Sequence, residues 1–154
     1  GAIFDILGER VVGGQVLDLY CGTGALGLEA ISRGAAAGTF VDNHRPALDT
    51  VRDNAEALGF LDRITCYNRR LPHQIDGSLG TNFDLIFSDP PYKSCVFNVL
   101  AERVFGARLL KEDGLWVHEM SSRSTVDMPS CWSVESQRRY GDTQLILLRP
   151  CQNS

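Results

Sequence analysis

Short apolar runs alternate with segments of helical periodicity between residue 16 and about residue 119. This alternation is typical of successive βαβ units, in which helices cover both faces of a parallel sheet. The pattern therefore predicts an α/β fold. The expected strands are residues 16–20, 38–42, 63–67, 84–88 and 115–119.

Two helices are predicted between these strands, because apolar side chains recur at intervals of three and four residues. The first helix is carried by Leu48, Val51, Ala55 and Leu58. Gly59 follows it, where a helix C-terminal cap is expected. The second helix is carried by Phe97, Leu100, Ala101 and Val104. Asp113 and Gly114 are interpreted as the turn between this helix and the fifth strand.

The pattern changes after residue 119. Residues 132–138 and 143–149 flank the tripeptide Tyr140-Gly141-Asp142. This spacing predicts a C-terminal antiparallel hairpin with its turn at residues 141 and 142.

The composition narrows the class of protein. A chain of 154 residues with 44% hydrophobic residues can form one domain with a packed core. It contains no run of eighteen apolar residues and no leader pattern, so we expect a soluble, cytoplasmic protein without a membrane partner. The net charge of -4 gives no overall attraction to nucleic acid, so RNA binding would depend on local basic clusters.

The five cysteines are odd in number and widely spaced, and none forms a Cys-x-x-Cys pair. This spacing argues against a disulfide framework and against a structural zinc ion. We therefore expect reduced thiols and no metal. We also expect a monomer.

A glycine-rich turn follows the first expected strand and opens a helix. Gly22, Gly24 and Gly27 form the pattern G-x-G-x-x-G, whose glycines let a cofactor approach the backbone closely. Asp42 ends the next strand, where its carboxylate can accept hydrogen bonds from both hydroxyls of a ribose. These features fit both NAD and S-adenosylmethionine.

Asp18 separates these two cofactors, because it lies in the strand that leads into the turn. A carboxylate there would repel the pyrophosphate of a dinucleotide but attract the ammonium and sulfonium groups of S-adenosylmethionine. We therefore predict that the chain binds S-adenosylmethionine. The expected contacts around the turn and the second strand are Asp18, Cys21, Gly22, Thr23, Gly24, Gly27, Asp42 and Asn43.

The tetrapeptide Asp89-Pro90-Pro91-Tyr92 follows the apolar run of the fourth strand. A rigid Pro-Pro turn would let the Asp89 carboxylate and the Pro90 carbonyl accept hydrogen bonds from one planar NH2 group, drawing its lone pair out of the ring plane. Tyr92 can stack on the base. Alone, the tetrapeptide is ordinary turn chemistry, but together with the glycine turn it predicts a methyltransferase that modifies a planar amine.

At these residues the sequence resembles the bacterial 16S ribosomal RNA guanine-N2 methyltransferase family, and the likeness covers nearly the whole chain. The matching pieces are residues 3–7, 16–30, 32–34, 40–42, 89–92 and 140–143. The resemblance implies a doubly wound, Rossmann-like class I methyltransferase with a seven-stranded mixed sheet in the order 3-2-1-4-5-7-6. It also implies that Asp89 and Tyr92 handle the base. The family usually has an acid after the third strand to bind the adenine amine, whereas Asn68 stands here and could serve only through its amide oxygen.

We therefore predict methyl transfer from S-adenosylmethionine to the N2 amine of a guanine in 16S ribosomal RNA, with ribosomal RNA or the small subunit as partner. The expected catalytic residues are Asp89, Pro90 and Tyr92. Adenine N6 and glutamine N5 remain open as substrates, because both are planar amines. A nicotinamide oxidoreductase is disfavoured by Asp18, and a non-catalytic RNA-binding module by the pI near 5.3.

A few residues keep two interpretations. Glu119 ends the fifth strand and faces either the same crevice or a salt-bridge partner. Cys95 is interpreted as a structural thiol, and His44 and His73 as loop side chains near the carboxyl edge of the sheet. Basic residues that could contact phosphates are Arg69, Arg70, Lys93, Arg138 and Arg139.

The sequence begins inside an amphipathic segment, in which Ile3, Phe4 and Leu7 lie at helical spacing. The resembling family carries a basic stretch before this point. We therefore expect residues 1–154 to form a single S-adenosylmethionine-dependent methyltransferase domain that lacks a short N-terminal RNA-binding segment.

Overall fold

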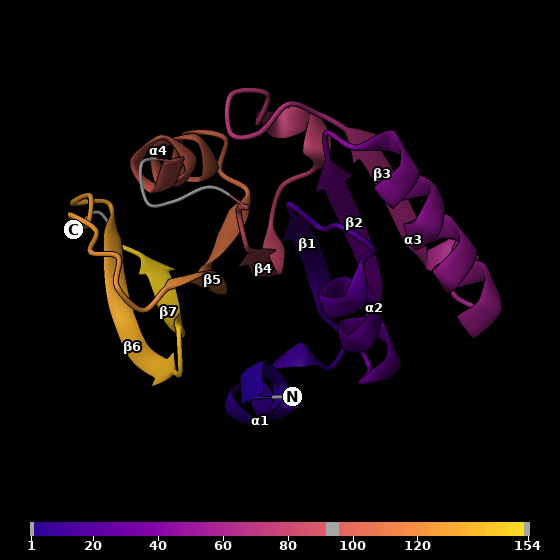
Figure 1. Cartoon of the computed structure of the whole chain (residues 1–154), viewed down its shortest axis with the longest axis horizontal. Helices are drawn as coiled ribbons and strands as arrows, with labels where there is room; N and C mark the ends of the chain where they lie inside the picture. The colour runs from indigo at the N-terminus through magenta and orange to yellow at the C-terminus, as the bar shows by residue number, and fades with distance from the viewer. Residues whose placement is uncertain (1, 92–95, 153–154) are drawn as a thin grey trace.

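A mixed seven-stranded sheet forms the centre of the computed structural model, which describes residues 2–91 and 96–152 (Figure 1). The strands are β1 (Gln15–Leu19), β2 (Ala37–Asp42), β3 (Ile64–Asn68), β4 (Phe83–Ser88), β5 (Leu110–Ser121), β6 (Trp132–Tyr140) and β7 (Thr143–Pro150). The helices are α1 (Ala2–Leu7), α2 (Ala25–Ser32), α3 (Arg45–Leu58) and α4 (Phe97–Gly106), with short 3-10 turns at Gly8–Val11, Leu61–Arg63 and Gly77–Leu79.

The strand order is β3-β2-β1-β4-β5-β7-β6, which confirms the expected topology. Strands β1 to β5 are parallel, whereas β7 runs antiparallel between β5 and β6. The C-terminal hairpin is confirmed, since β6 and β7 pair from Tyr140 and Thr143 outward. A doubly wound sheet of this kind places the carboxyl ends of its parallel strands at one edge.

Each face of the sheet has its own apolar layer, because successive side chains of a strand point to opposite faces. Val16, Phe40 and Leu85 belong to the layer that packs against α1, α2 and α3. Leu17 and Ile86 belong to the opposite layer, which packs against α4 and the segment around Leu79. Figure 1 shows α1 and α4 on opposite sides of the sheet.

Two local features predicted from the sequence are present, at the end of α3 and in α1. Gly59 adopts a left-handed φ of 79° after α3, so the expected C-terminal cap is confirmed. Phe4 and Leu7 are buried on α1, which confirms the amphipathic segment near the start of the sequence.

The predicted turn at Asp113-Gly114 is wrong. Both residues lie inside β5, which begins at Leu110 and pairs with β4 across a shift in register. Phe83 pairs with Leu110, but Leu85 pairs with Leu115, so β5 bulges in between. Gly114 suits this bulge, because a Cβ there would lie only 2.5 Å from Cδ1 of Leu110. The sequence signal for a turn marks an irregular strand instead.

No helix in the described ranges 2–91 and 96–152 is both long and apolar enough to cross a membrane.

Candidate functional site

The glycine turn links β1 to α2 at the carboxyl edge of the sheet. Tyr20 begins it with a φ of 59°, in the left-handed region that bulky residues rarely adopt. Gly22 and Gly24 also have positive φ, of 54° and 83°. The Gly24 N–H donates to the Cys21 carbonyl at 2.9 Å, which closes the turn directly before α2. The sequence therefore forms the sharp strand-to-helix turn that was predicted.

The three glycines of the motif do different things. A Cβ on Gly22 would have no atom within 4 Å, so this position leaves open space above the turn. A Cβ on Gly24 would lie 2.9 Å from a methyl group of Val51, and one on Gly27 would lie 2.7 Å from Cζ of Phe40. Gly24 and Gly27 are thus required by close packing of the turn on β2 and α3, and Gly22 leaves room for a ligand.

Asp42 connects the turn to the end of β2. Its carboxylate accepts a hydrogen bond from the Gly22 N–H at 2.8 Å and another from the His44 N–H at 3.1 Å. Because the side chain remains partly exposed, its oxygens have further lone pairs for a ligand. The predicted ribose-binding carboxylate therefore lies against the turn.

Asp18 lies beneath the turn rather than at its surface. The residue is only 3% exposed, and its carboxyl group accepts a hydrogen bond from the Gly27 N–H at 3.0 Å. Burial raises the pKa of Asp18 to about 8, and the nearby Asp42 and Asp89 carboxylates add to this increase. Asp18 thus supports the start of α2, and its raised pKa favours the protonated form near neutral pH.

The remaining predicted cofactor residues lie around the same edge. Asn43 and Thr23 are exposed, and the Thr23 carbonyl accepts a hydrogen bond from Asn54 of α3 at 3.3 Å. Cys21 is buried, and burial raises the pKa of its thiol well above the usual range. Asn68 is exposed at the end of β3, where it pairs in register with Asp42. Cys21 and Thr23 thus belong to the turn itself, and Asn68 lies beside Asp42 at the ends of β3 and β2.

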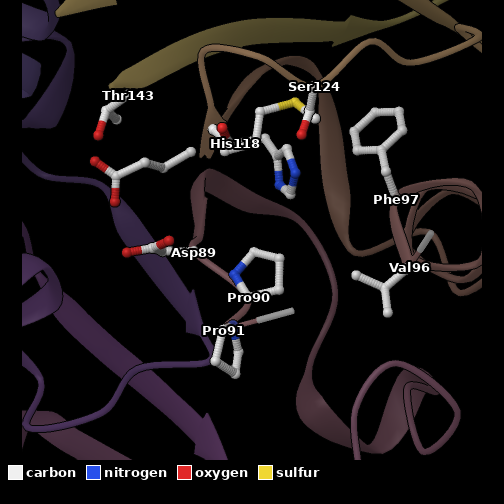
Figure 2. A pocket seen from close by; sticks show the side chains of 11 residues that line it. Asp89, Pro90, Pro91, Val96, Phe97, His118, Ser124 and Thr143 are labelled. Carbon is white, nitrogen blue, oxygen red and sulfur yellow. The ribbon is translucent and has the colours of Figure 1, made fainter. Parts of the chain in front are cut away.

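Asp89 and Pro90 line a cavity of about 280 Å³ at the carboxyl ends of β4 and β5. Figure 2 shows Asp89 and Thr143 on one side of this cavity and Val96 and Phe97 on the other, with Pro90 and His118 between them. The cavity also lies close to the glycine turn, because Leu19 and Ser88 are paired at the ends of β1 and β4. We call it the β4–β5 cavity. Tyr92, Lys93 and Cys95, which the sequence interpretation also singled out, lie outside the described residues.

Glu119 faces this cavity at the end of β5, where it meets Asp89. A hydrogen bond to the Asp89 carboxyl group and partial burial raise the pKa of Glu119 to about 8. Of the two interpretations left open for Glu119, the structure favours the crevice. Within the described ranges, the ion pairs formed by Lys and Arg do not involve Asp18, Asp42, Asp89 or Glu119.

A buried polar network behind the cavity was missed by the sequence interpretation. Trp116 Nε1 donates to Ser88 Oγ at 2.8 Å, and Ser88 Oγ is 2.7 Å from Nδ1 of His118. His118 is 1% exposed and lines the cavity, with its ring centroid 4.9 Å from that of Phe97. The signals in the sequence were a serine and a histidine among apolar strand residues. Only the pairing of β4 with β5, which puts Ser88 beside His118, brings the two side chains together.

Of the basic residues proposed for phosphate contacts, the four that the structure describes, Arg69, Arg70, Arg138 and Arg139, do not line the cavity. Arg69 forms an ion pair with Asp76 at 3.7 Å and donates to Ser78 Oγ at 3.0 Å. Arg138 and Arg139 are exposed on β6, the edge strand. No cluster of three or more His, Cys, Asp and Glu residues in the described part of the chain is arranged to hold a metal ion.

This arrangement combines two acidic residues, Asp18 and Asp42, at the glycine turn with a neighbouring cavity that presents two carboxyl groups and one imidazole; we call the two acidic residues the acidic cradle. The cradle suits a cationic, ribose-containing ligand, and the cavity has room for a planar polar group of modest size.

Comparisons with known proteins agree with this geometry. "Putative rRNA methyltransferase YlbH" of Bacillus subtilis is 35% identical over 120 residues, which cover 77% of this chain and 65% of that protein. The chain thus spans slightly less than two thirds of this relative's length. "Ribosomal RNA small subunit methyltransferase D" of Escherichia coli is 27% identical over 150 residues, covering 90% of this chain and 70% of that protein.

A solved structure of a conserved hypothetical protein from Streptococcus pyogenes superposes with a TM-score of 0.86 at 30% identity, covering 97% of this chain and 94% of that one. The family model described as "Conserved hypothetical protein 95" matches residues 1–149. Because this match covers almost the whole sequence, the chain belongs to that family of class I methyltransferase fold.

Proposed function

We propose that the chain transfers a methyl group from S-adenosylmethionine to the exocyclic N2 amine of a guanine in small-subunit ribosomal RNA. One observation supports the proposal: Asp89 and Pro90 line a cavity at the end of β4, the strand paired with the strand that leads into the glycine turn. The names of the relatives, which refer to ribosomal RNA methylation, support RNA as the substrate.

The residues around the turn fit S-adenosylmethionine. Gly22 leaves open space above the backbone, and Asp42 has lone pairs available for ribose hydroxyls. When bound, S-adenosylmethionine supplies an electrophilic methyl group on a positively charged sulfur. Asp18 lies under the turn with a raised pKa, and a cationic ligand nearby would favour its ionised form. The acidic cradle therefore suits this cofactor better than an anionic dinucleotide.

Asp89 and Pro90 supply the acceptors that the amine requires. One N–H of guanine N2 would donate to the Asp89 carboxylate and the other to the Pro90 carbonyl. Such bonds fix the plane of the amine and draw its lone pair away from conjugation with the ring. The same residues thus both position the nitrogen and make it a better nucleophile.

The amine must lose one proton for the methyl transfer to balance in charge. The nitrogen lone pair forms the new N–C bond as the C–S bond breaks, and the electron pair of that bond stays on sulfur, which becomes a neutral thioether. The nitrogen then carries one excess proton, which the Asp89 carboxylate can accept because it is already hydrogen-bonded to that N–H.

The test is mass spectrometry of the nucleosides formed when the protein and labelled S-adenosylmethionine are incubated with undermethylated small ribosomal subunits. We expect labelled N2-methylguanosine. Labelled N6-methyladenosine would show that adenine is the substrate, and labelled methylglutamine in a ribosomal protein would show that a protein is the substrate. Failure of the protein to bind S-adenosylmethionine in calorimetry would contradict the cofactor and the reaction together.

A further inference from the structure

We propose that the β4–β5 cavity recognises the Watson–Crick edge of guanine, with Glu119 accepting a hydrogen bond from N1–H and His118 donating one to O6. This inference rests on the proposed function, since it names the groups that select the base beside the reacting amine. It assigns these two residues, at the end of β5, to specificity.

Glu119 is paired with an acid instead of a base. Its hydrogen bond to Asp89 requires that the two carboxyl groups share a proton, consistent with the raised pKa of Glu119. An N–H donor from a ligand can replace that proton. Guanine offers three such donors along one edge, two on N2 and one on N1. Two adjacent carboxyl groups are therefore matched to the amine and its neighbour in the ring.

His118 supplies the complementary donor. Trp116 Nε1 can only donate, so Ser88 Oγ accepts from it and directs its own hydrogen toward Nδ1 of His118. Ser88 makes no other side-chain hydrogen bond in the described part of the chain. This relay places the histidine proton on Nε2. Burial lowers the pKa of His118 to about 4, so the ring stays neutral at physiological pH.

The free nitrogen of His118 is available to a ligand. In the described ranges, Nδ1 is engaged by Ser88, and no hydrogen bond occupies Nε2. The imidazole lines the cavity although the residue is 1% exposed, and Phe97 and Trp116 hold the ring from two sides. A fixed N–H donor in a nearly buried position selects a ligand that presents an acceptor.

The resulting pattern matches guanine better than adenine. Asp89 and Glu119 offer acceptors and His118 offers a donor, whereas the guanine edge presents donors on N2 and N1 and an acceptor at O6. Adenine, with its N6 amine at Asp89, would present the acceptor N1 where guanine has N1–H. Adenine therefore has no N–H at N1 to replace the proton shared by Asp89 and Glu119, and a Glu119 that had lost this proton would be repelled by the N1 lone pair.

The other titratable groups facing Glu119 lie across a second cavity, between α1 and β7. Glu29 of α2 and Tyr140 of β6 line it together with Glu119. Glu29 is bonded to Arg33 at 2.7 Å, so its charge is partly offset. Among the described residues, Asp89 is therefore the group in most direct contact with Glu119, through their hydrogen bond.

The first experiment uses the wild-type protein, so its result does not depend on whether a variant folds. Small subunits are reconstituted with ribosomal RNA that carries either guanosine or 2-aminopurine riboside at the nucleotide methylated in the preceding assay. The analogue keeps the 2-amino group but lacks N1–H and O6. We expect kcat/KM to fall about a hundredfold, because the buried His118 and the half-buried Glu119 both lose their partners. Equal rates would overturn the inference.

The second experiment separates the residues. Glu119→Gln and His118→Phe are compared with Glu112→Gln, an exposed position at the far end of β5. We expect the first two to lose about tenfold to a hundredfold in kcat/KM while affinity for S-adenosylmethionine stays within about twofold. They should also lower the preference for guanosine over 2-aminopurine riboside, which a purely structural defect would not change. The control should match the wild type.

The outcomes distinguish this inference from the proposed function. If the wild type forms N2-methylguanosine but Glu119→Gln and His118→Phe keep its preference, the inference is wrong and the proposed function stands. If the wild type forms no N2-methylguanosine, the proposed function fails, and the recognition proposed here fails with it.

Discussion

Asp89 is the side chain on which the proposed chemistry depends most. Asp89→Asn should lower kcat by about a hundredfold or more, because an amide replaces one acceptor by a donor that competes with the substrate amine. Affinity for S-adenosylmethionine should hardly change, since Asp42 and the glycine turn are untouched. Calorimetry and single-turnover rates give the two quantities. Loss of cofactor binding in the variant would instead place Asp89 in the cofactor pocket.

Asp18 should make the stability of the chain depend on pH. Its pKa is raised by burial from 3.8 to about 8, so the folded state binds this proton more tightly than the unfolded state does. The stabilisation is complete below about pH 4 and is lost as the pH rises to about 8. In Asp18→Asn the amide oxygen can still accept from the Gly27 N–H, and it does not titrate.

Between pH 5 and pH 8, the unfolding free energy of Asp18→Asn should therefore rise relative to that of the wild type by on the order of a few kcal/mol. Each tenfold change in proton affinity corresponds to about 1.4 kcal/mol. Urea titrations at several pH values measure this difference. Glu119 is present in both proteins, so its contribution to the pH dependence largely cancels in the difference between them. A constant difference across this range would mean that Asp18 is ionised in the folded chain.

Individual residues differ in how far sequence alone could identify them. Asp42 ends an apolar strand, Asp89 follows one and Asp18 lies near the end of one, so their positions at one sheet edge could be predicted. The partnership of Glu119 with Asp89 and the network around His118 could not, because they depend on which residues of β4 and β5 lie side by side. That register is set by the bulge in β5.

At the scale of elements, the packing of α2 on the sheet requires a residue without a side chain at Gly27. Gly27→Ala should destabilise the fold by about 1 to 3 kcal/mol, because the added methyl group would overlap the ring of Phe40. Gly106→Ala at the end of α4 is the matched control, since a Cβ there meets no atom within 4 Å and alanine favours a helix. Chemical denaturation of both variants tests the expectation, which an equal response would refute.

The elements themselves were predicted best where the apolar pattern was regular. Strands β1 to β4 and helix α3 lie within a few residues of their predicted bounds, because buried parallel strands and amphipathic helices have clear periodicity. β5 was placed too late, since polar residues Lys111, Glu112 and Asp113 at its start resemble a loop. The strand order came from the family resemblance, because local patterns do not encode it.

At the scale of the whole molecule, acidic groups from four strands converge on one sheet edge without basic partners among the described residues. Binding of a cation there should release a proton at pH 7, because it lowers a raised carboxyl pKa. We expect S-adenosylmethionine to release on the order of one proton, and the neutral product S-adenosylhomocysteine fewer. Calorimetry in buffers of different ionisation enthalpy counts these protons, and equal counts would contradict the expectation.

Both tryptophans of the chain lie in one half of the sheet. The Trp116 and Trp132 ring centroids are 4.9 Å apart, and Trp116 is linked through Ser88 to the wall of the β4–β5 cavity. Indole emission is sensitive to the hydrogen bonding and polarity around its own nitrogen. The intrinsic fluorescence of this chain should therefore report occupancy of the β4–β5 cavity without an added label, and the response to a base should exceed the response to the cofactor, because the Trp116–Ser88–His118 network ends at the cavity wall.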